Sequence, residues 1–290
     1  MGKCCVSGAG AINVDYKTRT VEIEGITLKE GDFISLNGTT GEVYKGKVET
    51  KAAEVSGDFA ALMDLCNKYT KLNVRTNADT PHDAEVARAF GASGIGLCRT
   101  EHMFFDAEKI VAMREMILSP DVEGRRKALA KLLPFQKADF KGIFKAMDGC
   151  PVNVRLLDPP LHEFVPHDAK GQEEMAKAMG VTVQEIKKRV ESLCEHNPML
   201  GHRGCRLGNT YPEITEMQTQ AILGAAIELK KEGYDPHPEI MVPLTGILYE
   251  FEAQEKVIRD AAAALFEKEG MEIPFKVGTM IEIPRAALTA

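Results

Sequence analysis

Residues 275–284 read Phe-Lys-Val-Gly-Thr-Met-Ile-Glu-Ile-Pro, and this stretch decides the predicted fold. The side chains from Val277 to Ile283 alternate between two faces, which is the pattern of a β-strand in a sheet core. Pro284 has no amide hydrogen to donate to a sheet, so we expect the strand to end there. Glu282 then lies at the carboxyl end of the strand, where α/β barrels place catalytic and metal-binding groups.

The chain continues for only six residues beyond Pro284. A strand followed by the first residues of its helix is an unusual end for a domain. The sequence therefore predicts a truncated barrel.

Upstream of this stretch, strands alternate with amphipathic helices back to about residue 56, which indicates βα units around a parallel sheet. We predict further strands at 72–76, 94–99, 152–158, 202–207 and 239–244. Helices are predicted over 85–90, about 107–147, about 170–193, 212–233 and around 257–265. About six strand–helix units favour an α/β fold that is an incomplete (β/α)8 TIM-type barrel. A complete open sheet of six strands is the alternative.

Residues 1–50 have a different pattern and predict a small β-rich domain. Strands at 33–36 and 41–44 flank Asn37-Gly38, which is a strong hairpin-turn signal. We expect no helix in this part. The predicted domains are therefore residues 1–50 and the truncated barrel of residues 51–290.

Composition excludes several classes of protein. The chain has 290 residues, 44% of them hydrophobic, and a net charge of −7 with both signs interspersed, which argues against a nucleic-acid groove. It has no run of about 18 apolar residues and no secretory signal, so we expect a soluble cytoplasmic protein without membrane partners. The seven cysteines form no C-x-x-C pair, which fits reduced, mostly buried thiols.

Three arginines lie at or near the carboxyl ends of predicted strands, and one carboxylate lies on the same rim: Arg99, Arg155, Arg203 and Glu282. The planar guanidinium group suits bidentate contacts to phosphate or carboxylate, and a carboxylate is a hard oxygen ligand for Mg²⁺. Any single arginine at a strand end is more often a structural ion-pair partner. Three of them with Glu282 on one rim predict a small polyanion bound beside a divalent cation.

Other polar residues near this rim are expected to support it. Asp158 either orients Arg155, assists Mg²⁺, or only ends its strand. Glu101 is expected to hold Arg99 from behind. Three histidines near the rim are expected to be structural: His102, His162 and His202.

Several segments resemble the phosphoenolpyruvate-utilising enzyme family, and within it the group of pyruvate, phosphate dikinases. Residues 96–101 match the family motif G-L-x-R-T-E. Residues 155–164 and 197–206 are similar to R-x-L-D-P-P-L-H-E-F and N-P-M-L-G-x-R-G-x-R of the dikinases. Residues 280–287 resemble the metal-ligand strand, and residues 2–9 resemble the stretch after the phosphorylated histidine. The similarity runs essentially end to end.

This resemblance implies part of a modular enzyme that interconverts ATP, phosphate and pyruvate with AMP, pyrophosphate and phosphoenolpyruvate. A swivelling phosphohistidine domain, of which residues 1–50 would be a remnant, carries the phosphoryl group to a barrel that binds pyruvate or phosphoenolpyruvate with Mg²⁺. Carried over by position, Arg99 and Arg155 would be the catalytic clamp on the phosphoryl group. Arg203 would hold the substrate anion, and Glu282 would coordinate Mg²⁺. The whole enzyme is expected to be a homo-oligomer, such as a dimer, in the cytoplasm, or in a plastid or glycosome in some eukaryotes.

The resemblance also has gaps. The family's phosphorylated histidine, in a T-x-H motif, is expected about a dozen residues before Met1, and none of the seven histidines of this sequence has its context. The family's ATP-grasp domain is also missing from this sequence. An Asn-Asp metal-ligand pair and the cysteine that protonates the enolate are expected beyond Ala290. We therefore expect the isolated chain to be inactive and at most to bind phosphoenolpyruvate. Phosphoenolpyruvate synthase and enzyme I of the sugar phosphotransferase system stay open as alternative parents.

Overall fold

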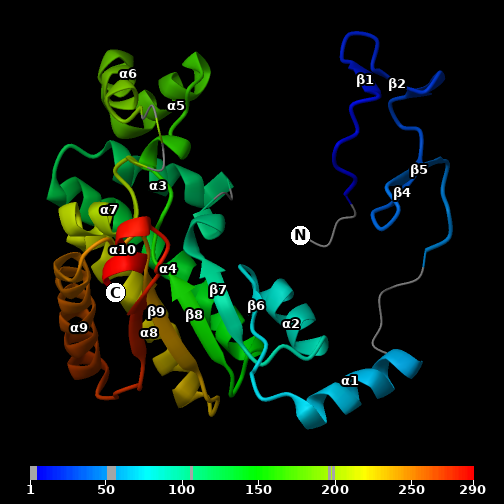
Figure 1. The fold of residues 1–290 in the computed structure, drawn as a ribbon. Helices are drawn as coiled ribbons and strands as arrows, with labels where there is room; N and C mark the ends of the chain where they lie inside the picture. The colour runs from blue at the N-terminus through cyan, green and yellow to red at the C-terminus, as the bar shows by residue number, and fades with distance from the viewer. Residues whose placement is uncertain (1–4, 51–56, 105–106, 195–196, 198–199) are drawn as a thin grey trace. The chain divides into compact units, whose positions relative to one another are not determined.

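The computed structural model describes residues 5–50, 57–104, 107–194, 197 and 200–290. It divides into two compact units, Met1–Tyr69 and Thr70–Ala290 (Figure 1). Our predicted boundary between residues 50 and 51 separates two segments that we assigned to different domains of a larger enzyme. That assignment stays a prediction. The resemblances at residues 2–9 and 197–206 fall partly on residues 1–4 and 198–199, outside the described residues.

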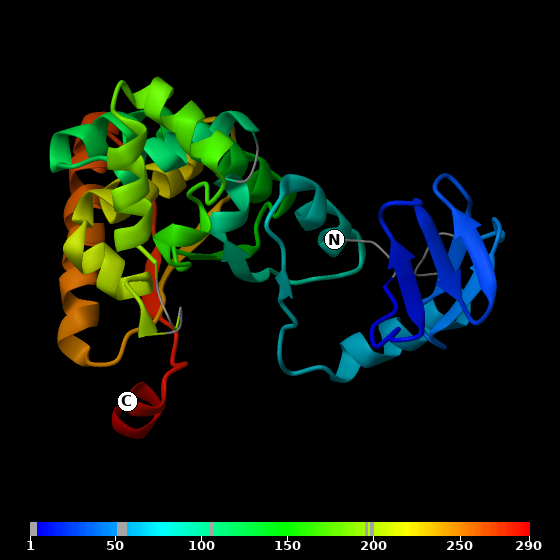
Figure 2. The same ribbon diagram turned by 90° about the horizontal axis from the view of Figure 1, so that it is seen from above.

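The first unit confirms the predicted β-rich part. Its elements are β1 (Ile12–Asp15), β2 (Thr20–Ile23), β3 (Ile26–Lys29), β4 (Ile34–Asn37), β5 (Glu42–Lys45) and α1 (Gly57–Tyr69). The first three strands form an antiparallel sheet, and β4 and β5 form the hairpin predicted around Asn37 (Figure 2, blue). Leu28 is the one buried side chain among the described residues of this unit.

The second unit confirms the predicted α/β class. It contains a parallel sheet of five strands in the order β10-β9-β8-β7-β6 (Figure 1). The strands are β6 (Thr76–Asn77), β7 (Ile95–Arg99), β8 (Pro151–Arg155), β9 (His237–Val242) and β10 (Lys276–Thr279). This arrangement is consistent with a partial α/β barrel.

Helices connect these strands. They are α2 (Pro81–Ala89), α3 (Ala107–Leu118), α4 (Val122–Ala146), α5 (Ala169–Met179), α6 (Val183–Ser192), α7 (Gly204–Thr210), α8 (Pro212–Lys231), α9 (Leu248–Glu269) and α10 (Pro284–Thr289), with 3-10 turns η1 (Thr100–Phe104) and η2 (Leu161–Glu163). The Thr80 hydroxyl accepts the Asp83 N–H at 3.1 Å and begins α2. Among the described residues, no helix combines the length and apolar content that crossing a bilayer requires.

One face of the sheet forms the main core. Its side chains are fully or almost fully buried against α4 and α8: Ile95, Cys98, Val152, Val154, Ile240 and Val242. Because successive residues of a strand point to opposite faces, Arg99 and Arg155 lie on the other, partly covered face. The polar residues of the strands are therefore kept out of the core.

The strand predicted at 202–207 is wrong, because this segment begins α7. Arg203 is still extended, but Gly204 adopts the left-handed conformation with φ at +57°, which turns the chain into the helix. The alternation of Cys205 and Leu207 resembled a strand, although both are buried side chains of a helix. The sheet consequently has five strands rather than six.

The other predicted strands also differ at their ends, as three examples show. β6 covers only Thr76–Asn77 instead of 72–76, and β8 ends at Arg155 instead of residue 158. β10 is an edge strand that is only partly buried, and it ends at Thr279. The Met280 N–H makes one further bond to the Val242 carbonyl at 3.1 Å. Pro284 therefore begins α10, where a missing amide hydrogen costs nothing, instead of closing the strand.

Candidate functional site at the carboxyl edge of the sheet

Two of the predicted arginines are register partners. Arg99 ends β7 and pairs with Arg155, which ends β8, and Arg155 in turn pairs with Met241 of β9. Neighbouring strands lie about 4.8 Å apart, and register partners in a parallel sheet point to the same face. The two guanidinium groups therefore leave the sheet from adjacent positions at its carboxyl edge.

Asp79, which follows β6, anchors Arg99. Its Oδ2 accepts hydrogen bonds from Arg99 Nη2 at 2.6 Å and Nε at 3.0 Å, and its Oδ1 accepts the Arg99 backbone N–H at 2.8 Å. His102 Nδ1 lies 2.9 Å from the same Oδ2. The hydrogen bond that Arg99 donates to the Asp79 carboxylate raises the pKa of the Arg99 guanidinium above its ordinary value, so Arg99 stays charged.

A second cluster joins Arg155 to Arg203. Arg155 Nη2 donates to Glu101 Oε1, and its Nη1 lies 3.1 Å from Asp158 Oδ2. Arg203 Nη2 donates to the same Asp158 oxygen at 2.7 Å. The four side chains are between 5% and 14% exposed, so these ion pairs are shielded from water. Asp158 is therefore the bridge between the two arginines.

The carboxylates that contact Arg99 and Arg155 differ in one respect from the expected ones. We expected Glu101 to hold Arg99, but Glu101 contacts Arg155, and Asp79 takes the place beside Arg99. Asp79 was missed by the sequence analysis. The signal was present, because a carboxylate directly before the Thr80 cap and two residues after a short strand lies on this edge.

Glu282 lies at the same edge of the sheet, in the segment between β10 and α10. Its Oε1 accepts the backbone N–H of Leu244 at 2.8 Å. Leu244 follows β9 and has a φ of +61°, which is rare for a residue with a side chain. This unusual backbone conformation directs the Leu244 N–H toward the carboxylate.

The start of α7 packs directly onto Leu244. A Cβ atom added to Gly204 would lie 2.9 Å from the Leu244 Cβ, which is too close for a stable contact. The Cys205 N–H donates to the Pro243 carbonyl at 3.0 Å, and the Cys205 thiol donates to the Leu244 carbonyl. The segment that carries Arg203 is thus tied to the segment that orients Glu282. Figure 1 shows α7 and α10 near this end of the sheet.

Glu282 is the carboxylate that we expected to coordinate Mg²⁺. In the part of the chain that the structure describes, no three histidine, cysteine, aspartate or glutamate side chains gather closely enough to hold a metal ion. Mg²⁺ is commonly bound through one or two carboxylates, with substrate oxygens and waters completing an octahedron. Glu282 suits that role only if the substrate and water supply the other ligands.

The thiols near the site are not suited to catalysis. Complete burial raises the pKa of the Cys98 thiol well above its ordinary value, and burial raises the pKa of Cys205 to about 11. Because the thiolate is the reactive form, both groups are inert near neutral pH. This agrees with the expected structural role of the buried cysteines.

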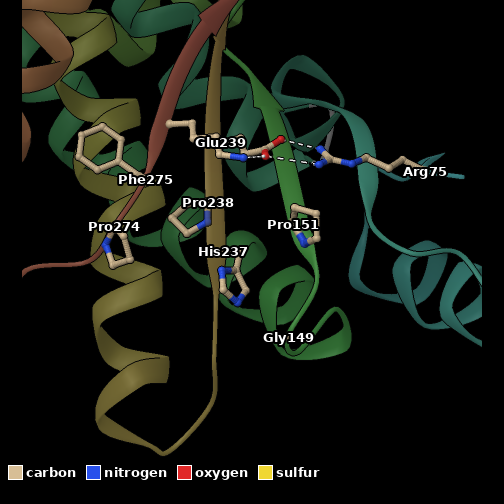
Figure 3. Close-up of a pocket in the computed structure, with 9 residues that line it drawn as sticks. Arg75, Gly149, Pro151, His237, Pro238, Glu239, Pro274 and Phe275 are labelled. Atoms are coloured by element: carbon tan, nitrogen blue, oxygen red, sulfur yellow. Dashed lines mark hydrogen bonds and ion pairs between the residues drawn. The ribbon is translucent and has the colours of Figure 1, made fainter. Parts of the chain in front are cut away.

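A cavity of about 360 Å³ lies at the opposite, amino edge of the sheet (Figure 3). Figure 3 shows Arg75 and Glu239 pointing toward each other, with an Nη1–Oε2 distance of 2.5 Å, and Lys276 Nζ lies 3.3 Å from Glu239 Oε1. Burial favours a higher pKa for Glu239, but the hydrogen bonds from Arg75 and Lys276 outweigh it and lower the pKa. The charged groups of this cavity thus pair with one another, and the cavity lies at the end of the sheet opposite to the one where α/β barrels place their active sites.

Comparison with known proteins identifies the family. Residues 53–290 match the family described as "PEP-utilising enzyme, PEP-binding domain". The whole chain is 55% identical to a pyruvate, phosphate dikinase of Clostridium symbiosum and 56% identical to one of Giardia intestinalis, in each case over 33% of the relative's length. It is 53% identical to pyruvate, phosphate dikinase 1, chloroplastic, of Oryza sativa, over 31% of that protein.

The chain therefore spans about a third of the length of the curated relatives it matches. The similarity covers every residue quoted above for the motifs, which confirms the resemblance found in the sequence. Arg99, Arg155, Arg203 and Glu282 all lie inside the matched domain. The chain belongs to the family of phosphoenolpyruvate-utilising enzymes.

Proposed function

We propose that the second unit binds phosphoenolpyruvate and pyruvate at the carboxyl edge of its sheet, as part of a pyruvate, phosphate dikinase. That enzyme would interconvert ATP, pyruvate and phosphate with AMP, phosphoenolpyruvate and pyrophosphate through a phosphohistidine. The observation that carries the proposal is the register pairing of Arg99 with Arg155, together with the Asp158 bridge to Arg203.

The rim arginines are held in place without substrate, and one of their N–H donors is left for an anion. Three arginines face three carboxylates, those of Asp79, Glu101 and Asp158, so the cluster is held together before any substrate arrives. The Nε of Arg155 is buried and has no hydrogen-bond partner among the described residues. An unsatisfied buried N–H of a charged group is costly, and an anion oxygen would relieve that cost.

In this proposal each side chain has one task. Arg99 and Arg155 hold the equatorial oxygens of the transferring phosphoryl group and spread its charge, while Arg203 holds the substrate carboxylate. Glu282 would hold Mg²⁺, which as a Lewis acid stabilises the enolate oxygen. Asp158 keeps Arg155 and Arg203 at a set spacing.

Titration calorimetry with phosphoenolpyruvate and Mg²⁺ tests the binding site. We expect Arg155→Ala and Arg155→Lys both to weaken binding at least tenfold, because neither side chain can bridge two oxygens as arginine does. Arg126→Ala, which removes an exposed helix arginine paired with Glu216, is the matched control and should bind like the wild type. Equal affinity in all four proteins would refute the clamp, provided that each unfolds cooperatively.

We also propose that this polypeptide alone does not catalyse the full reaction, because the relatives named for that activity are about three times as long. An assay with pyruvate, ATP and phosphate should show no phosphoenolpyruvate above background. Formation of phosphoenolpyruvate that depends on all three substrates would contradict this proposal. The assignment of residues 1–50 to a phosphohistidine domain, the magnesium ion and the dimeric parent are parts of the same proposal.

A further inference from the structure

We propose that Asp79 is a positioning residue for Arg99, holding its guanidinium so that the remaining donors face the transferring phosphoryl group. This inference rests on the proposed function of the rim. Asp79 is not part of any motif identified in the sequence. It lies between β6 and α2, and its side chain is 9% exposed.

The carboxylate binds both ends of Arg99. Its Oδ1 accepts the backbone N–H at 2.8 Å, and its Oδ2 accepts Nη2 at 2.6 Å and Nε at 3.0 Å. With its backbone and its guanidinium tied to one group, the long side chain retains few rotamers. Such preorganisation lowers the entropy lost when a ligand is bound.

The contacts with Asp79 also determine which N–H donors of Arg99 can face a ligand. The edge of the guanidinium formed by Nε and Nη2 faces Asp79, so the edge that carries Nη1 is directed away from that carboxylate. The Arg99 side chain is 36% exposed, whereas those of Arg155 and Arg203 are 12% and 14% exposed. Arg99 is therefore the arginine of the rim that most needs an anchor to keep one orientation.

Asp79 acts on the second cluster as well. His102 Nδ1 lies 2.9 Å from Asp79 Oδ2, and His102 is part of η1, which also contains Glu101. Glu101 in turn contacts Arg155. One carboxylate thus restrains the end of β7 and the turn after it, and through that turn the group that holds Arg155.

The first test needs no ligand. In the ¹⁵N NMR spectrum of arginine side chains, the Nε–H of Arg99 should exchange slowly with solvent, and its signal is assigned by its loss in Arg99→Met. Asp79→Asn keeps the size of the side chain but replaces one acceptor oxygen by an amino group. We expect exchange of the Arg99 Nε–H to accelerate at least tenfold in Asp79→Asn, and unchanged exchange would overturn the anchor.

The second test is a double-mutant cycle on phosphoenolpyruvate affinity in the presence of Mg²⁺, measured by ligand-observed ³¹P NMR. Asp79→Asn should weaken binding about tenfold in the wild-type background and much less in the Arg99→Met background, where only its contact with the turn η1 is left to lose. A merely structural role would lower affinity equally in both backgrounds. Asp139→Asn, which removes the carboxylate paired with Lys109 between α3 and α4, is the control and should not change affinity.

The two kinds of failure can be told apart. If the wild-type chain binds no phosphoenolpyruvate, the proposed function fails, and the role of Asp79 fails with it. If the wild type binds but Asp79→Asn binds equally well, or weakens binding equally in both backgrounds, only the positioning role is overturned.

Discussion

At the scale of single residues, the rim is a set of ion pairs that neutralise one another, and those of Arg155 and Arg203 are largely buried. Asp158 is the carboxylate that two arginines share, because its Oδ2 contacts both Arg155 and Arg203. Paired buried charges are tolerable in a protein interior, but removing one partner leaves the other charge without compensation. The stability of the rim and the spacing of Arg155 and Arg203 therefore depend on the same carboxylate.

Asp158→Asn should lower the free energy of unfolding by about 3 kcal/mol, because two largely buried arginines lose their shared acceptor. Urea denaturation followed by circular dichroism measures this change. Asp260→Asn removes the carboxylate of an exposed pair with Lys256 and should leave the midpoint nearly unchanged. A midpoint for Asp158→Asn equal to that of the wild type would show that the bridge contributes nothing to stability.

The buried thiols predict a pH dependence. Burial raises the pKa of Cys205 from 9.0 to about 11, so the folded state favours the protonated thiol. Its contribution to stability is complete below pH 9 and is lost as the pH rises through about 11. At pH 8.5 we expect iodoacetamide to modify Cys66 and Cys194 much faster than Cys98 and Cys205.

Mass spectrometry of the peptides measures these rates, and all the cysteines should react at similar rates in denaturant. Modification of Cys205 in the folded protein as fast as Cys194 would contradict its assignment as a structural thiol.

The positions of Arg99 and Arg155 were predictable, and their partners were not. Strand periodicity places Arg99 and Arg155 at strand ends on the face away from the core. Which carboxylate meets which arginine depends on the turn η1, whose 3-10 geometry moves Glu101 toward Arg155. Asp79 and Arg99 are far apart in the sequence and meet only because β6 and β7 are adjacent in the sheet.

At the scale of elements, the contact between α7 and the end of β9 joins the two sides of the site. Gly204 allows this contact because it has no Cβ and adopts a φ of +57°. Leu244, on the other side of the contact, has a positive φ of its own and donates to Glu282. Unusual backbone conformations of this kind cost free energy and persist where the surrounding structure enforces them.

Gly204→Ala should destabilise the protein by about 2–3 kcal/mol, from the strained φ together with the clash with Leu244. The control is Gly270→Ala at the end of α9, where φ is +64° and no atom lies within 4 Å of an added Cβ. That variant measures the cost of the backbone conformation alone. Chemical denaturation of both should give the larger loss at Gly204, and equal losses would show that the close approach to Leu244 is unimportant.

The same elements show where sequence patterns succeed and fail. The helix α8 was predicted from Pro212 to Gly233, because a proline at its start and a glycine after its end are local signals. The helix α7 was mistaken for a strand, because it is only seven residues long and a short apolar alternation cannot be separated from a helix by periodicity. Its conformation follows from the turn at Gly204 and from packing against Leu244.

At the scale of the second unit, charged residues of the sheet lie in two separate groups, one at each edge. The carboxyl edge has Arg99, Arg155 and Arg203 with their carboxylates, whereas the amino edge has the cavity in which Arg75 and Lys276 pair with Glu239 (Figure 3). The α/β class was predicted because strands alternate with helices along the chain. The number of strands was not, because it depended on the single segment at 202–207.

The central claim, that the carboxyl edge is the phosphoenolpyruvate site, is tested most directly by ¹⁵N NMR of the thirteen arginine side chains during titration with phosphoenolpyruvate and Mg²⁺. We predict that the Nε–H signals of Arg99, Arg155 and Arg203 shift together along one binding curve, while those of Arg75 and Arg259 stay in place. Shifts at Arg75 without shifts at the three rim arginines would place the ligand at the amino edge and contradict the account.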